Sequence, residues 1–189
     1  LLGESFVKIL DDAQGTTVGT TQLVFSIGGL IVLYSLWWLY FSDTAGTIID
    51  FENPIKPYLW VYGHLPLAAG LIAFGVAAKK LYSSTLDYPD KALNPDYRLL
   101  YTAAIVLYLV ALALIDAGVD DETTHQSQTY QLFIHLICAV IIGIFGVLVV
   151  DVTATQFVGV VAFVMFVQVA VSIYDDRKAS LHQTQSDSV

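Results

Sequence analysis

The stretch WVYGHLPLAAGLIAFGVAA, residues 60–78, decides the fold of this 189-residue chain. It contains no Asp, Glu, Lys or Arg. At about 1.5 Å per residue, a helix of this length nearly covers the roughly 30 Å hydrocarbon core of a bilayer. We therefore predict a membrane-spanning helix over residues 58–78.

The same pattern recurs along the chain, in which 56% of the residues are apolar and only 13% are charged. Uncharged windows predict five full spans, at residues 22–41, 58–78, 99–115, 130–150 and 156–174. The last two are separated by a short segment around Asp151, and one helix over both would be too long for a single crossing, which favours a helical hairpin. The predicted fold is an all-α, polytopic transmembrane helix bundle.

The bundle is expected to occupy residues 1–174, followed by a polar C-terminal tail at 175–189. Residues 1–12 have a helical apolar pattern and form a partial N-terminal helix, either the end of a longer helix or a short surface helix. Because the chain does not start with Met, we expect it to begin within a longer protein or after processing. The expected location is integral and multi-pass in a lipid bilayer, with no nucleic-acid partner and with the particular membrane left open.

The orientation in the membrane depends on the basic residues. Side two is the membrane face that receives loops 42–57 and 116–129 and the tail, and side one is the opposite face. Five Lys or Arg residues fall on side one and three on side two. This favours side one as cytoplasmic, but a margin of two residues leaves the orientation open.

Amphipathic aromatic residues mark the ends of the spans. The segments SLWWLYF and KPYLWVY carry the side chains that settle at headgroup depth, where the ring and its polar tip are both accommodated. The predicted interface aromatics are Trp37, Trp38, Tyr40 and Trp60.

Two histidines are the candidate functional groups inside the spans. His64 and His135 each lie roughly 8–9 Å in from the side-two end of their spans, and Asp43 and Asp116 end two other spans on that side. Such a layer could hold a divalent cation or relay protons. Alternatively, each histidine simply donates to a carbonyl of a neighbouring helix, or serves as an axial ligand of a pigment. The metal and the cofactor therefore stay unknown.

Small residues follow one stripe of the span at 58–78. Pro66 cannot donate to the carbonyl of Tyr62, so a kink is expected there. The stripe offers a neighbouring helix close approach. Its members are Gly63, Pro66, Gly70, Ala73 and Ala77.

The catalytic signatures of soluble enzymes are missing from the sequence. It has no P-loop, no CxxC pair, no HExxH and no GxSxG element, and no lysine lies within a span to form a retinal Schiff base. We therefore predict that the protein is not an enzyme.

Three segments carry a family resemblance. LLGES at residues 1–5, LWWLYF at 36–41 with the nearby Asp43, and YGHLPLAAGLIAFGVAAKKL at 62–81 resemble the second half of the bacterial low-temperature-requirement A (LtrA) family. The resemblance covers roughly residues 1–115. It implies that residues 1–12 end a transmembrane helix, which would place Glu4 within the membrane near His64 and Asp43 as parts of a polar track.

The sequence also departs from the family pattern. LtrA proteins are about twice as long and often carry arginines after the YFD element, whereas no base follows here before Lys56. The resemblance does not by itself supply a biochemical activity.

These observations lead to two main hypotheses about function. The first is proton- or cation-coupled transport, or membrane adaptation, that uses Glu4 and His64. The second is a non-catalytic subunit that packs in a larger membrane assembly or a homo-oligomer, with bound lipid or pigment as an option. A membrane-embedded enzyme of lipid metabolism, with a metal in the side-two layer, is a more distant third.

Overall fold

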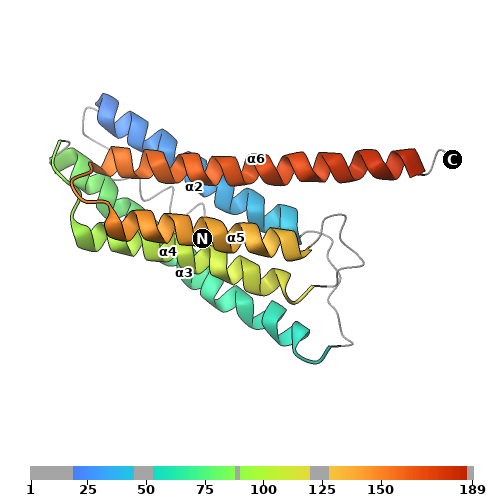
Figure 1. The fold of residues 1–189 in the computed structure, drawn as a ribbon. Coiled ribbons are helices and arrows are strands. Elements are labelled where there is room, and N and C mark those ends of the chain that lie inside the picture. The colour runs from blue at the N-terminus through green and yellow to red at the C-terminus, as the bar shows by residue number, and fades with distance from the viewer. Residues whose placement is uncertain (1–18, 45–52, 88–89, 120–127, 187–189) are drawn as a thin grey trace.

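A computed structural model of the chain describes residues 19–44, 53–87, 90–119 and 128–186. Every regular element in these ranges is an α-helix, which confirms the all-α prediction (Figure 1). The helices are α2 (Thr20–Thr44), α3 (Lys56–Asp87), α4 (Pro95–Asp116), α5 (Gln128–Leu148) and α6 (Ala154–Ser186). The predicted partial helix at 1–12, which contains Glu4, lies outside the described residues.

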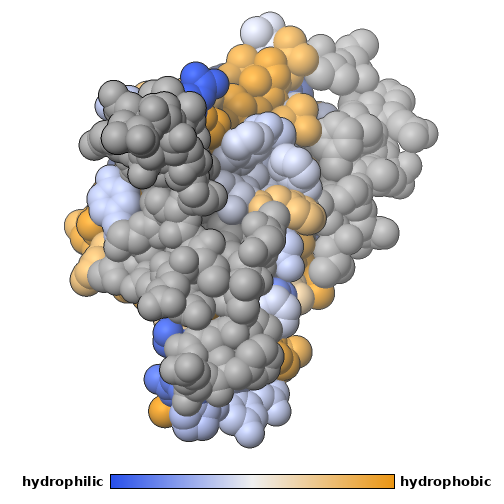
Figure 2. Space-filling model, turned by 90° about the vertical axis from the view of Figure 1, so that its right-hand side faces the viewer, coloured by the Kyte–Doolittle hydropathy of each residue, from blue (hydrophilic) through white to orange (hydrophobic). Residues whose placement is uncertain are grey.

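All five helices are long and apolar enough to cross a membrane, as the sequence predicted. Large apolar side chains remain exposed on their outer faces, including Tyr34 on α2, Leu65 on α3 and Phe163 on α6. Figure 2, an end-on view from the right of Figure 1, shows hydrophobic side chains at the outer rim of the bundle. An apolar exterior of this kind is the surface that lipid chains cover. The protein is therefore an integral, multi-pass membrane protein.

Two helices extend by more than two turns beyond their predicted spans. α3 has 32 residues and continues through Lys79 and Lys80 to Asp87, so at about 1.5 Å per residue it is about 48 Å long and projects from the hydrocarbon. α6 continues to Ser186, so the helix does not end at the predicted domain boundary at residue 174. No Gly or Pro follows Gly159 to break α6, and residues such as Arg177 favour helix.

The helices pack in an order that differs from their order along the chain. α3 lies along α4 and α4 along α5, whereas α6 packs mainly along α2. α5 and α6 are separate helices, as the hairpin prediction required. However, α5 packs mainly on α4 and α6 mainly on α2, so α5 and α6 contact each other much less. The chain turns between them at Asp151, whose φ of 61° lies in the left-handed region that Asp tolerates better than most residues.

A reciprocal pair of hydrogen bonds starts α6. The Gln156 amide N–H lies 3.3 Å from Thr153 Oγ1, and the Thr153 amide N–H donates to Gln156 Oε1 at 3.1 Å. This is a capping box, and it satisfies two amides that have no partner within the helix.

We expect Thr153→Ala to lower the free energy of unfolding by about 1 kcal/mol, the usual cost of losing an N-cap side chain. Thr155→Ala is the matched control, because the buried Thr155 hydroxyl makes no hydrogen bond within the described residues. Thermal unfolding in detergent measures both variants. Equal melting temperatures for the two variants would contradict the role given to Thr153.

The stripe of small residues on α3 faces α4. Gly63, Gly70 and Ala77 are all buried. A methyl carbon added at Gly70 would lie 3.0 Å from the Ala104 carbonyl oxygen and 3.0 Å from the Tyr108 amide nitrogen. The two backbones can approach this closely only because Gly70 has no side chain. Ala73 and Pro66 are half-buried, and α3 continues through Pro66.

Polar contacts join the helices across the bundle. The Tyr108 hydroxyl on α4 donates to the Leu36 carbonyl of α2 at 2.7 Å. At the side-one end of the bundle, the buried Arg98 guanidinium near the start of α4 donates to the Val149 carbonyl just after α5. A cation at the C-terminus of a helix complements its dipole and binds carbonyls that have no partner within the helix.

Candidate functional site

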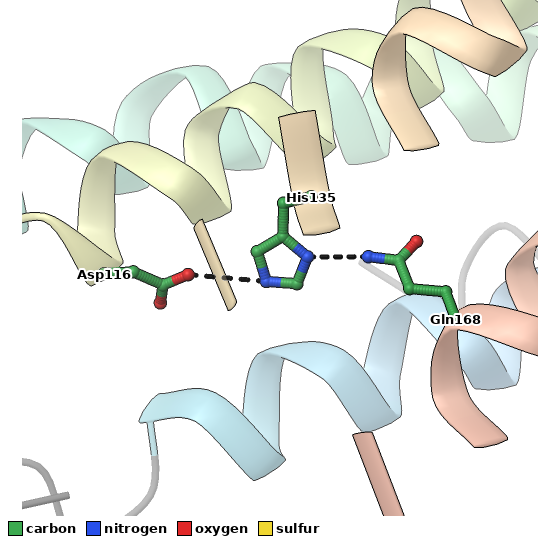
Figure 3. A network of polar contacts seen from close by, with 3 residues as sticks. All are labelled: Asp116, His135 and Gln168. Carbon is green, nitrogen blue, oxygen red and sulfur yellow. Dashed lines mark hydrogen bonds and ion pairs between the residues drawn. The ribbon is translucent and has the colours of Figure 1, made fainter. Parts of the chain in front are cut away.

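A buried histidine joins three helices near side two. His135 lies on α5, and Asp116 is the last residue of α4. His135 Nε2 is 3.4 Å from Asp116 Oδ2. Its Nδ1 lies 2.6 Å from Nε2 of Gln168 on α6. Figure 3 shows the imidazole between the carboxylate and the amide, with its two nitrogens facing opposite partners.

All three side chains are removed from solvent. The exposed fractions are 2% for His135, 4% for Asp116 and 2% for Gln168. A buried carboxylate or imidazolium is costly unless a partner compensates it. Because an imidazole lies beside the carboxylate, a charge on one group can be balanced by a charge on the other. The arrangement therefore suits a group that gains and loses a proton inside the membrane.

With the Gln168 amide in this orientation, its hydrogen bond assigns the tautomer of neutral His135. The Gln168 amide nitrogen donates, so the facing Nδ1 must be the bare, accepting nitrogen. The single imidazole proton then lies on Nε2, the nitrogen that is 3.4 Å from Asp116 Oδ2.

Protonation of His135 would require Gln168 to turn. The imidazolium carries N–H donors on both nitrogens, so its Nδ1–H would face the donating amide nitrogen of Gln168. Rotation of the amide by 180° brings Oε1 to this position as an acceptor. Gln168 Oε1 is buried and makes no hydrogen bond within the described residues, so the rotation breaks no bond that this oxygen makes. The site thus has one amide orientation for each charge state of His135.

The second histidine has a different environment. His64 Nδ1 lies 2.7 Å from the Trp60 carbonyl one turn earlier, and its Nε2 lies 3.3 Å from the Tyr40 hydroxyl. Its ring also packs on the indole of Trp60, with 4.7 Å between ring centroids. A proton on Nδ1 satisfies the carbonyl, and Nε2 then accepts from Tyr40. His64 is half-buried. The alternative predicted a carbonyl of a neighbouring helix, whereas the carbonyl of Trp60 belongs to α3, the helix of His64 itself.

The structure brings together only part of the predicted side-two layer. His135 and Asp116 meet, whereas the contacts found for His64 are with Trp60 and Tyr40. Asp43 belongs to the last turn of α2, but its side chain is outside the described residues, as is Glu4. The predicted track through Glu4, His64 and Asp43 therefore stays a prediction. Within the described part of the chain, no three His, Cys, Asp or Glu side chains are grouped to hold a metal ion.

The predicted interface aromatics divide between two environments. Trp37 is exposed and packs on Phe41 with 5.1 Å between ring centroids, as expected for a residue that faces lipid. Trp38 and Tyr40 are half-buried against the core. Tyr40 and Trp60 surround His64, so they contribute to its polar environment as well as to the rim of the bundle.

Sequence reasoning missed Gln168. It considered only side chains that can carry a charge, and an amide in the middle of an apolar span does not meet that condition. The available signal was the run AFVMFVQVAVSIY, where one Gln interrupts the lipid-compatible residues. Polar side chains at such positions commonly hydrogen-bond across helices.

The five apolar helices, which enclose the buried side chains of Asp116, His135 and Gln168, define a polytopic α-helical integral membrane protein. The family model of the bacterial low temperature requirement A protein (LtrA) matches residues 1–171. The chain therefore belongs to the LtrA family, which confirms the resemblance found in its sequence and extends it beyond residue 115. Comparison with curated proteins and with solved structures gives no match.

Proposed function

We propose that the protein is a proton-coupled membrane transporter in which His135 binds and releases the transported proton. The observation that carries this proposal is the burial of His135 between Asp116 and Gln168. Histidine is the side chain that most readily changes charge near neutral pH. An ionisable residue inside a membrane bundle commonly marks a proton or ion pathway.

The position of the three groups supports a route for the proton from side two. Asp116 is the last residue of α4 on that side, and His135 lies seven residues, about 10 Å, inside the start of α5. Gln168 lies fourteen residues, about 21 Å, from the start of α6 on side one. A proton that enters from side two would therefore reach the carboxylate first and the imidazole next.

The two histidines provide a matched test of the proposal. The full chain is reconstituted in liposomes that contain a trapped pH-sensitive dye, and proton flux is recorded under a membrane potential with gradients of Na⁺, K⁺ or Mg²⁺ in turn. His135→Asn is expected to reduce the flux at least about 100-fold, the lower limit for losing an essential proton-transfer group. His64→Asn should leave it within about two-fold, because the His64 contacts include no carboxylate among the described side chains.

The comparison is valid only when both variants elute as monodisperse protein with melting temperatures close to that of the wild type. The proposal fails if the wild type carries no proton flux under any of these gradients, or if His135→Asn transports as well as the wild type. Loss of flux in His64→Asn alone would move the site to the Tyr40–His64–Trp60 group.

A further inference from the structure

A pocket opens at the side-one end of the bundle, far from His135. It lies where the end of α3 meets the segment before α4, and its volume is about 440 Å³. Lys80 lines it from α3, Lys91 lines it from the connecting segment, and Tyr97 lines it from the first turns of α4. Small-molecule sites in proteins measure roughly 300–1,000 Å³, so the volume suits an organic group.

The charges around the pocket favour an anion. Lys80 and Lys91 contribute two positive charges and Asp87 one negative charge, so the lining has a net charge of +1. The Lys80 amino group lies 5.9 Å from the centroid of the Tyr97 ring, a cation–π contact that directs it toward α4. The two ammonium groups thus come from two segments of the chain that border one pocket.

The pocket lies at the depth of lipid phosphates. The uncharged part of α3 ends at Ala78, and Lys80 is two residues, about 3 Å, beyond it along the helix. Lysines at this position extend toward the headgroup region, where the phosphates of lipids lie. Side one is also the face with more Lys and Arg residues.

Exposed apolar side chains lead from the pocket toward the centre of the membrane. Val76 and Ile72 lie four and eight residues before Lys80, on the same face of α3, and both are exposed. Leu100 lies three residues after Tyr97 on α4 and is also exposed. A ligand with its anion in the pocket could therefore place hydrocarbon chains along this surface.

We propose that this pocket binds the phosphate of an anionic phospholipid in the side-one leaflet. A free phosphate has five heavy atoms and would fill only a small part of about 440 Å³, given that one water occupies about 30 Å³. A headgroup with glycerol fills more of the volume, and its acyl chains use the strip through Val76 and Leu100. A zwitterionic lipid gains less, because its headgroup has no net negative charge to match the lining.

Native mass spectrometry of the purified full chain tests the site. Delipidated protein is incubated with phosphatidylglycerol or phosphatidylcholine, and the retained lipid is counted. We expect Lys80→Gln or Lys91→Gln to weaken retention of phosphatidylglycerol about 5-fold, and the double variant about 25-fold. Lys79→Gln is the matched control, because Lys79 is exposed beside Lys80 and does not line the pocket.

Four outcomes would overturn the proposal. The wild type could retain no phosphatidylglycerol, or it could retain phosphatidylcholine equally well. Lys79→Gln could weaken retention as much as Lys80→Gln, which would indicate general surface attraction. Excess inorganic phosphate could displace the lipid completely, which would indicate a site for the free anion.

Because Lys80 and Lys91 are both exposed, the variants are expected to fold, and their melting temperatures check this.

Discussion

Proton flux in the Asp116→Asn variant is expected to fall by at least about 100-fold. Asparagine keeps the size of the side chain but cannot carry the negative charge that faces His135 Nε2 at 3.4 Å. An imidazolium formed at His135 would then be a buried charge without its counter-ion, and such a loss typically costs about 3–5 kcal/mol. That free energy corresponds to roughly a 150-fold to 4,000-fold smaller population of the protonated state. Dye-loaded proteoliposomes measure the effect on the flux.

Two further variants separate this electrostatic role from a structural one. Asp116→Glu keeps the charge on a longer side chain and should retain a measurable part of the flux. Combining Asp116→Asn with His135→Asn should cause no further loss, because residues that act as one unit are not additive. Flux in Asp116→Asn equal to the wild-type flux would show that the carboxylate is not the counter-ion of a transported proton.

Within the described residues, the sequence predicted the five membrane-spanning helices but not all their ends. Uncharged windows identify the part of a helix that lies in hydrocarbon, because the cost of burying a charge applies only there. The helix itself continues until the backbone is interrupted or capped. Lys79 and Lys80 therefore ended the predicted span, although α3 continues to Asp87. The same reason explains why α6 continues to Ser186.

Only part of the candidate site around His135 could be predicted from the sequence. Distance from the membrane surface follows from position in a span, so the sequence could place His135 and Asp116 at similar depths. Which side chains meet depends also on the order and rotation of the helices. A helix that is apolar on all sides gives little sign of which face is buried, and α6 packs on α2, more than a hundred residues away in the chain. The contact with Gln168 and the separate environment of His64 required the structure.

Gly70→Leu is expected to have the largest effect on stability, lowering the free energy of unfolding by at least about 3 kcal/mol. Overpacking a well-packed core typically costs about 1–3 kcal/mol and occasionally more. At Gly70 the new side chain would meet backbone atoms of Ala104 and Tyr108, which cannot rotate away as a flexible side chain can. The helices must separate instead, and α4 is also tied to α2 by the hydrogen bond from Tyr108 to the Leu36 carbonyl.

The control for this variant is Gly159→Leu on α6, where the added carbon would have no neighbour within 4 Å and the position is exposed. Leu favours helix over Gly by up to about 1 kcal/mol, so this variant should match or exceed the wild type in stability. Thermal unfolding in the same detergent compares the three proteins. Equal melting temperatures for Gly70→Leu and Gly159→Leu would mean that α3 and α4 tolerate a wider separation at Gly70. Close backbone packing would then contribute little to holding the bundle together.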